Sequence, residues 1–285
     1  MELSEQTLEK LSKLIHRLCG LVIGPDKGYL VRHRLGPLVQ SEGLESLEQL
    51  LLRLEGRGGS RLHDAIIEAI TTKETSFFRD RAFFRALREV VLPERVEALK
   101  QSGDLRHRIR IWSAGCSTGQ ECYSVAMLIR ELVAASGAAG PRENHFNILA
   151  SDISTESIRI AKAGRYSRNE VARGLPAELL DRHFHRRGEH WIVDDALGRL
   201  VQFRRFDLLN SPVELGAFDV ILCRNVLIYF DESARRRIYH GLYSVLQDGG
   251  WLALGAAESL FGAEHRFETV KVGPTILYRK PSRRG

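Results

Sequence analysis

The chain has 285 residues, of which 44% are hydrophobic and 27% charged, and this fits one large soluble domain together with a smaller one. Its formal net charge of +6 at pH 7 is mild, and no long Lys/Arg block is present, so the composition does not indicate nucleic acid as a partner. The charge supports at most a weak preference for acidic partners.

We expect neither a targeting segment nor a metal site. Residues 1–5 are not a basic region followed by an apolar run, and no stretch of about 18 uninterrupted apolar residues exists that could insert into a membrane. The cysteines form no C-x-x-C pair and have no histidine cluster beside them, so we expect reduced thiols. They are Cys19, Cys116, Cys122 and Cys223. Together these features predict a cytoplasmic protein.

Residues 1–80 are predicted to form an N-terminal helical domain. Apolar side chains recur there at spacings of three and four on three segments, separated by breaks at Gly24-Pro25 and at residues 56–59. These side chains are Leu8, Leu11, Ile15 and Leu18; Leu44, Leu47, Leu50, Leu51 and Leu54; and Leu62, Ile66, Ile67 and Ile70. Residues 81–108 are predicted to be a linker, with a helix over 83–99 that Pro93 breaks or kinks, followed by a polar loop.

Residues 109–285 are predicted to form an α/β domain with a doubly wound parallel sheet and a mainly antiparallel last strand, because strands alternate with helices. The expected strands are 109–114, 146–151, 218–223 and 251–254, with a closing hairpin over 269–278; the expected helices are 120–135 and 238–246. Residues 166–201 interrupt this alternation. A short helix over 176–184 and strands at 191–193 and 200–201 predict an inserted β-subdomain there.

Two features at the ends of the first two strands could bind a nucleoside. The glycines of Gly115-x3-Gly119 allow backbone amides to approach a ligand, although a plain strand-to-helix turn has the same pattern. No Lys-Ser/Thr follows, so a phosphate loop is not indicated. Asp152 could accept hydrogen bonds from ribose hydroxyls, or it could be an ordinary acid at a helix N-terminus.

Further along the chain, polar residues lie at two more positions of this kind. Glu121 is in the first turn after the glycine loop, where it could pair with a ligand ammonium group or simply interact with the helix dipole. Arg224, Asn225 and Tyr229 follow the fourth sheet strand, where ligands bind in open α/β sheets. A strand tip with these three side chains is not expected to serve packing alone.

Four segments, in this order along the chain, resemble the CheR-type chemotaxis receptor methyltransferases. They are 71–80 (TTKETSFFRD), 112–121 (WSAGCSTGQE), 150–154 (ASDIS) and 218–230 (FDVILCRNVLIYF). The resemblance covers nearly the whole chain, from about Leu8 to Arg279. It implies a protein-glutamate O-methyltransferase that uses S-adenosyl-L-methionine, releases S-adenosyl-L-homocysteine, and acts in adaptation of chemosensory signalling. It also implies a class I methyltransferase (Rossmann-like) domain over 109–285, preceded by an all-α domain. The position of residues 71–80 between the helical segment and the first strand suggests a lid that joins the two domains.

The resemblance also implies roles for individual residues. Arg79 and Tyr229 would face the reacting methyl group. The cofactor-contacting residues would be Lys73, Thr75, Arg79, Gly115, Glu121, Asp152, Asp207, Leu208, Cys223, Arg224 and Asn225. The chain departs from the family at Lys73 and Asp207, where Asn is common. Asp207 could still accept a hydrogen bond from the adenine amino group.

The partner implied by the resemblance is the cytoplasmic domain of a chemoreceptor, whose methylation helices are acidic. Arg32, His33 and Arg34 form a basic cluster that could meet them, or they could be a solvated face. The turn over 185–190 is shorter than in members that bind a receptor C-terminal peptide, so we expect no such tethering, and we expect a monomer. Two alternatives stay open: a methyltransferase for nucleic acid or small molecules, and a cofactor-sensing module that has lost transfer.

Overall fold

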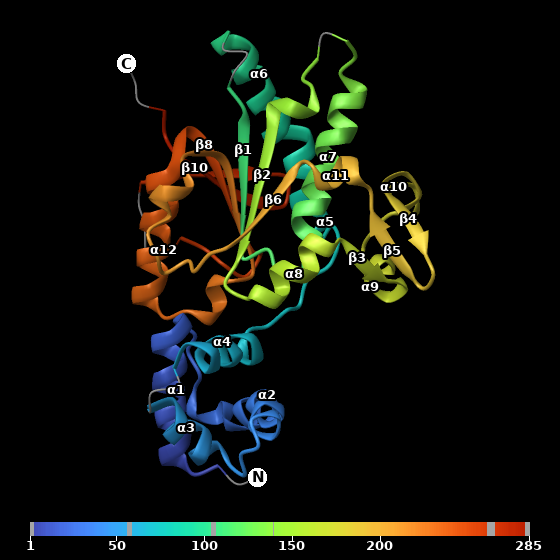
Figure 1. Ribbon diagram of the computed structural model, residues 1–285. Coiled ribbons are helices and arrows are strands. Elements are labelled where there is room, and N and C mark those ends of the chain that lie inside the picture. Colours follow the sequence, from blue (N-terminus) through green and yellow to red (C-terminus); the bar gives the residue numbers. More distant parts are fainter. Residues whose placement is uncertain (1–2, 56–58, 104–106, 139, 261–265, 283–285) are drawn as a thin grey trace.

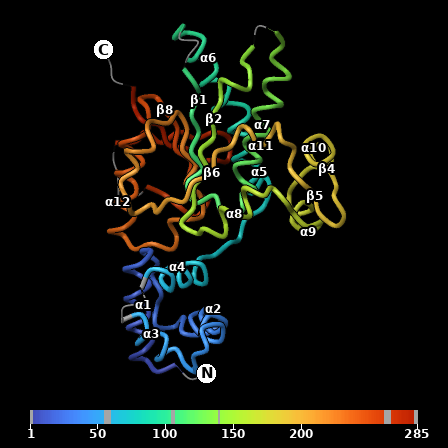
Figure 2. Tube along the Cα trace, in the orientation of Figure 1, coloured from blue at the N-terminus to red at the C-terminus, as the bar shows by residue number. Residues whose placement is uncertain are grey.

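The computed structural model describes residues 3–55, 59–103, 107–138, 140–260 and 266–282. A small helical domain lies below a larger α/β domain, from whose side a small β-subdomain projects (Figure 1). The Cα trace passes from the small domain to the sheet layers along the segment between α4 and α5 (Figure 2). None of the helices in the described ranges is both long and apolar enough to cross a membrane.

The small domain consists of helices around one apolar core, as predicted. Ser4 accepts a hydrogen bond from the Thr7 N–H and begins the first helix, and Gly20 ends it with φ 72°. The helices are α1 (Glu5–Cys19), the 3-10 turn η1 (Pro25–Lys27), α2 (Gly28–Ser41), α3 (Leu47–Glu55) and α4 (Gly59–Ile70). Helix α2 is not among the three predicted segments, because Pro37 lies inside it and its buried face is narrow, with Val31, Leu35 and Val39 as its buried residues.

The predicted linker helix is part of the core of the large domain. Helices α5 (Arg81–Ala86) and α6 (Leu92–Ser102) are joined without a gap by a π-helical turn, η2 (Leu87–Val91). The π turn ends just before Pro93, whose ring would clash with the preceding turn in a regular helix, so the expected break takes this form. Phe83 packs in the same hydrophobic cluster as the sheet.

The large domain contains a seven-stranded sheet with the order β6-β2-β1-β7-β8-β10-β9. The strands are β1 (Ile109–Ala114), β2 (Phe146–Asp152), β6 (Val201–Arg205), β7 (Phe218–Cys223), β8 (Leu246–Leu254), β9 (Glu268–Val272) and β10 (Thr275–Arg279). The first five of these in spatial order pair in parallel, and β10 is antiparallel to both of its neighbours, as the sequence predicts.

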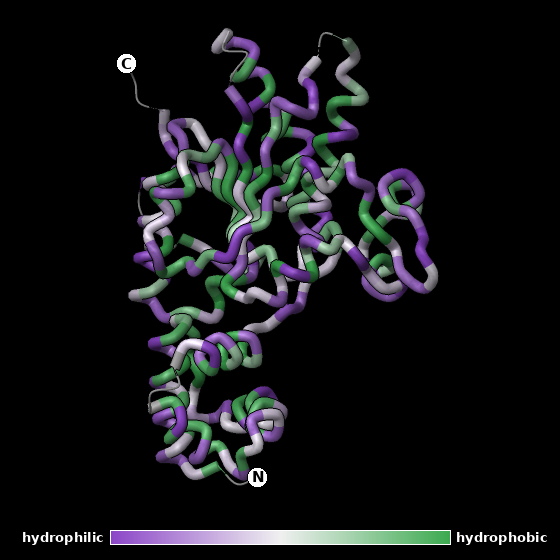
Figure 3. Tube along the Cα trace, in the orientation of Figure 1, coloured by the Kyte–Doolittle hydropathy of each residue, from purple (hydrophilic) through white to green (hydrophobic). Residues whose placement is uncertain are grey.

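Helices cover both faces of this sheet. The main ones are α7 (Gln120–Ala135), α8 (Thr155–Ala163) and α12 (Glu232–Val245). Successive residues of β1 point to opposite faces, so Ile111 and Trp112 belong to two separate hydrophobic clusters. The strands form the hydrophobic centre of the domain (Figure 3). Helix α12 begins six residues before the expected 238, because Asp231 caps it by accepting from the Ala234 N–H.

The inserted β-subdomain is a separate three-stranded antiparallel sheet with the order β3-β5-β4. Its elements are β3 (Arg165–Ser167), α9 (Arg168–Ala172), α10 (Ala177–His183), β4 (Phe184–Arg187), β5 (His190–Val193) and α11 (Asp195–Gly198). The assignment of residues 200–201 to this subdomain is wrong. Val201 begins β6 and pairs in parallel with Ile148, so it belongs to the edge of the main sheet.

Candidate functional site

A cavity of about 350 Å³ lies where the carboxyl ends of β1, β2 and β7 meet the small helical domain. Its volume is in the range of small-molecule sites. Most of the predicted site residues line it: Thr75, Arg79, Gly115, Glu121, Asp152, Asp207, Leu208, Arg224, Asn225 and Tyr229. The fold therefore brings together predicted site residues that are up to about 150 positions apart in the chain.

The structure does not place Lys73 and Cys223 on the wall of this cavity. The Lys73 ammonium group lies 3.3 Å from the carboxylate of Glu68 on α4. Cys223 is the last residue of β7 and is fully buried in the sheet. Burial raises the pKa of its thiol well above the usual range, so it stays neutral.

The loop after β1 brings its backbone against the cavity. Gly115 has φ 81°, and a Cβ atom there would lie 2.5 Å from Val226, so a glycine is required. Ser117 has φ 50°, and its N–H donates to the Asp152 carboxylate over 2.8 Å. The Ser117 hydroxyl is buried and has no hydrogen-bond partner among the residues that the structure describes, although buried polar atoms normally have one. Ser117 was not predicted, and it could donate to a ligand.

Asp152 connects two turns at the carboxyl end of β2. Its two oxygens accept from the Ser117 N–H at 2.8 Å and from the Ser154 N–H at 2.9 Å. Burial raises the pKa of this carboxyl above its usual value, and the two backbone hydrogen bonds oppose that rise. Two bonds leave lone pairs free, so the carboxylate could also accept from ribose hydroxyls.

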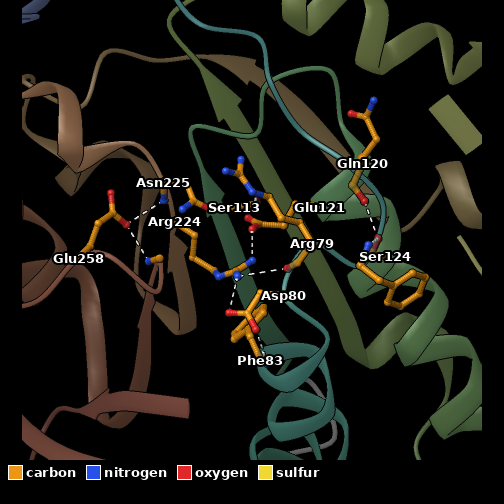
Figure 4. A network of polar contacts seen from close by, with 12 residues as sticks. Arg79, Asp80, Phe83, Ser113, Gln120, Glu121, Ser124, Arg224, Asn225 and Glu258 are labelled. Atoms are coloured by element: carbon orange, nitrogen blue, oxygen red, sulfur yellow. Dashed lines mark hydrogen bonds and ion pairs between the residues drawn. The ribbon is translucent and has the colours of Figure 1, made fainter. Parts of the chain in front are cut away.

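The side chain of Arg224 points into the protein interior and binds residues that form the cavity wall. Its guanidinium donates to Glu121 over 3.0 Å, and to the carboxylate of Asp80 and the carbonyl of Arg79 over 3.2 Å each (Figure 4). It also lies 4.0 Å from the centre of the Phe83 ring. The Glu121 carboxylate, which was predicted to meet a ligand, thus already has a cationic partner.

Arg79 is exposed, in contrast to Arg224. Its Nη1 atom donates to the carbonyl of Glu74 over 3.1 Å, and its remaining donors include the second terminal nitrogen. Phe78 and Asp80, on either side of it, have φ 48° and 70°. Such backbone conformations are unfavourable without glycine, and they concentrate at functional sites.

Glu258 is a site residue that the sequence analysis missed. Its carboxylate accepts four backbone N–H groups: those of Asn225, Leu227 and Gly255 at 2.7 Å, and that of Ile228 at 3.2 Å. These bonds hold the loop after β7, including Asn225 at φ 59° (Figure 4). Only its position four residues after the end of β8 could have drawn attention to it.

The remaining predicted residues lie at another part of the wall. Asp207 is partly buried, accepts from the Leu209 N–H over 2.9 Å, and has a pKa raised by burial. Leu208 is partly buried beside it and packs against the hydrophobic cluster on the α12 side of the sheet. An acceptor beside an apolar side chain suits a planar heterocycle with an amino group.

The small helical domain forms the opposite wall, which the sequence analysis did not anticipate. The N–H of Val22 donates to the carbonyl of Tyr229 over 2.9 Å, and Leu21 and Phe230 form an antiparallel bridge. The lining residues from this domain are Cys19, Leu21, Val22, Ile23, Lys27, Tyr29, Leu30, Ile70, Thr71 and Thr72. The described residues contain no group of three or more acidic, histidine or cysteine side chains arranged to hold a metal ion.

Comparison with known proteins agrees with this arrangement. Residues 6–71 match the CheR methyltransferase all-alpha domain, and residues 73–276 match the CheR methyltransferase SAM-binding domain. The chain is 38% identical to chemotaxis protein methyltransferase 1 of Pseudomonas aeruginosa, over 98% of this chain and 99% of that protein. It is 40% identical to a chemotaxis protein methyltransferase of Vibrio anguillarum, over 97% and 98%.

The matches cover both domains, and the cavity lies at the carboxyl ends of the strands, where open α/β sheets bind their ligands. The predicted cofactor, S-adenosyl-L-methionine, and the predicted methyltransferase fold are therefore confirmed. The chain belongs to the CheR methyltransferase family.

Proposed function

We propose that this chain transfers methyl groups from S-adenosyl-L-methionine to glutamate side chains on the cytoplasmic helices of chemoreceptors. The observation that supports it best is a single cavity whose wall includes both Arg79 and Tyr229, bounded by both domains. The names of the relatives, chemotaxis protein methyltransferases, agree with a role in chemosensory signalling.

The residues around the cavity fit the cofactor. S-adenosyl-L-methionine supplies a methyl group on a positively charged sulfur. Asp152 has free lone pairs for ribose hydroxyls, the buried Ser117 hydroxyl has no partner within the described part of the chain, and Gly115 leaves room for a close approach to the backbone. Asp207 and Leu208 would hold the adenine. Glu121 is a partly buried acid close to where a ligand ammonium group could lie.

The protein does not need a general base for this reaction, because a glutamate is already ionised at neutral pH. Arg79 has an exposed guanidinium on the cavity wall, which can bind a carboxylate through two parallel hydrogen bonds. Tyr229, which is 37% exposed, would shape the channel and exclude water from the carboxylate. Alignment of this kind can lower a barrier by about 7–11 kcal/mol at most.

The basic cluster predicted to meet the receptor divides into two parts. Arg32 and His33 are exposed and line a groove on α2 together with Tyr29. Arg34 is only partly exposed and donates to the carbonyl of Thr71 over 2.7 Å, so it fastens the segment between the domains. We therefore assign attraction of the acidic receptor helix to Arg32, which shares the groove with His33.

Three further parts of the proposal concern the protein's assembly and partners. The strands β4 and β5 are joined by the two residues Gly188 and Glu189, which supports a subdomain that does not tether a receptor C-terminal peptide. We also propose that the chain acts as a monomer in the cytoplasm, and that nucleic acid is not its substrate. Sedimentation of the purified chain would test whether it is a monomer.

The deciding experiment is transfer of labelled methyl from S-adenosyl-L-methionine to a chemoreceptor cytoplasmic fragment from the same organism, followed by mild alkali. Label on the fragment that is released as methanol would establish a carboxyl methyl ester. If the chain binds S-adenosyl-L-homocysteine but labels no receptor fragment, the substrate assignment is wrong, and the cofactor-sensing module becomes the better account.

A further inference from the structure

Three apolar side chains that line the cavity are also open to solvent. Val22 is 48% exposed, Tyr29 is 65% exposed and Tyr229 is 37% exposed. Single apolar residues on a surface are ordinary, but several around one concave site indicate an interaction surface. We call these three residues the apolar collar.

The collar is built by both domains and is held by backbone hydrogen bonds. The Val22 N–H donates to the Tyr229 carbonyl, and the Leu21–Phe230 bridge follows directly. Two collar residues therefore keep a fixed spacing that does not depend on their side chains. A preformed apolar surface loses little conformational freedom when a partner binds to it.

Cations border the collar. Lys27 and Arg79 line the same cavity, and Tyr29 also lines the adjoining groove with Arg32. An apolar surface bordered by cations is complementary to a partner that presents an acidic side chain beside an apolar one. On an α-helix, the neighbours of an acidic residue on the same face lie three or four positions away.

We propose that the apolar collar is a docking surface for the substrate helix, and that it recognises an apolar side chain three or four residues from the glutamate to be methylated. This inference rests on the proposed function. The target carboxylate enters the cavity toward Arg79 while its apolar neighbour packs on Val22 and Tyr29. The collar thereby selects among the acidic residues of a helix, because charge alone would attract all of them.

The test compares KM for the receptor fragment in the full chain and its variants. We expect Val22→Ser and Tyr29→Ser each to raise this KM about tenfold, as expected when one apolar contact is lost, with kcat and the affinity for S-adenosyl-L-homocysteine unchanged. Tyr29→Phe should restore the wild-type value. Leu52→Ser in the same domain and Ile276→Ser in the other are matched controls, being 68% and 52% exposed away from the cavity.

A second experiment changes the substrate instead of the enzyme. Replacing the apolar neighbour of one methylated glutamate by Ser should slow methylation at that glutamate by a similar factor, and adding Val22→Ser should cause little further loss. Additive losses would overturn the proposal, as would an unchanged KM in both collar variants while the wild type still labels the fragment.

Other outcomes separate this inference from the proposed function. If the wild type labels no receptor fragment although S-adenosyl-L-homocysteine binds, both proposals are wrong. If the collar variants lose affinity for S-adenosyl-L-homocysteine, the collar belongs to the cofactor site and the inference is wrong. If the wild type sediments as a dimer and Val22→Ser as a monomer, the collar joins two copies of this chain instead.

Discussion

Arg224 and Glu121 form an ion pair at 3.0 Å in which the arginine side chain is only 1% exposed. A second carboxylate, that of Asp80, lies 3.2 Å from the same guanidinium. One cation thus ties the loop after β7 to the start of α7 and to the segment that contains Arg79. The arginine is buried while Glu121 and Asp80 are 15% and 30% exposed, so the buried cation in particular depends on these carboxylates to offset its own desolvation.

Replacing Arg224 by Met should therefore destabilise the protein strongly. The change leaves two acids at the wall without their cation, and such a loss costs about 3–5 kcal/mol. Urea unfolding followed by circular dichroism measures it. Arg88→Met is the control, because its pair with Glu89 is more than half exposed on both sides and should contribute less than about 1 kcal/mol. Equal unfolding midpoints for the two variants would contradict the structural role of Arg224.

Glu258→Gln should lower turnover without unfolding the protein. In the wild type, both carboxylate oxygens of Glu258 accept backbone N–H groups. A glutamine keeps one of these acceptor oxygens, but its NH₂ group takes the place of the other and faces N–H donors without accepting from them. The loop that includes Asn225 and Tyr229 should lose its fixed position, and we expect kcat to fall about tenfold or more.

The control for this loop is Glu232→Gln, which removes only an exposed pair with Arg236. Glu258→Asp keeps the charge and should recover part of the activity. The role assigned to Glu258 is wrong if Glu258→Gln and Glu232→Gln have the same kcat at equal thermal stability.

The sequence predicted which residues gather at the cavity better than it predicted how they point. Arg224 was placed at a strand tip because parallel strands expose their carboxyl ends at one edge of the sheet. Its inward direction depends on Asp80, which lies 144 positions earlier in the chain. Local pattern contains no information about that contact, so the sequence alone could not show that the guanidinium is held by Asp80.

The opposite wall was missed for a related reason. Val22 lies in a short connection after α1, with no periodic neighbours, and it meets Tyr229 only through the packing of two domains. Residues 200–201 were misplaced because a two-residue apolar run fits either a subdomain hairpin or an edge strand. The strands β1, β2 and β7 were predictable, because their short, largely apolar runs are local features.

Asp152→Asn should weaken binding of S-adenosyl-L-homocysteine about tenfold or more. Both carboxylate oxygens accept backbone N–H groups, so the amide NH₂ would face the donor of Ser117 or of Ser154. Isothermal titration calorimetry measures the loss. Asp181→Asn, on α10 of the β-subdomain and away from the cavity, is the matched control.

The affinity should also depend on pH through Asp152. Burial raises its pKa above that of an ordinary aspartate, so the group gains a proton at a higher pH as the solution is acidified. The protonated form accepts fewer hydrogen bonds, and affinity should fall with decreasing pH through that raised pKa. Protonation also removes the cost of burying the charge. The contribution of Asp152 to the free energy of unfolding should therefore increase as pH falls through the raised pKa. Loss of the pH step in Asp152→Asn would identify the group, and its persistence would point to another residue.

Arg79→Ala should reduce kcat about a hundredfold even when S-adenosyl-L-methionine is saturating, because the exposed guanidinium is proposed to hold the substrate carboxylate. Arg79→Lys should recover only part of the activity, since a lysine retains the charge but not the paired donors. Arg81→Ala, an exposed arginine at the start of α5, is the control. Near-normal turnover of Arg79→Ala with cofactor bound would rule out this role.

Arg32→Glu should raise KM for the receptor fragment and make it less sensitive to salt. Opposite charges on enzyme and helix attract one another in dilute salt, and added ions screen that attraction, so the wild type should lose affinity as ionic strength rises. The reversed charge removes the attraction that salt would screen. Lys100→Glu makes the same charge change on α6, away from the cavity and groove, and should leave KM unchanged. If both variants change KM equally, net charge rather than the α2 groove attracts the receptor.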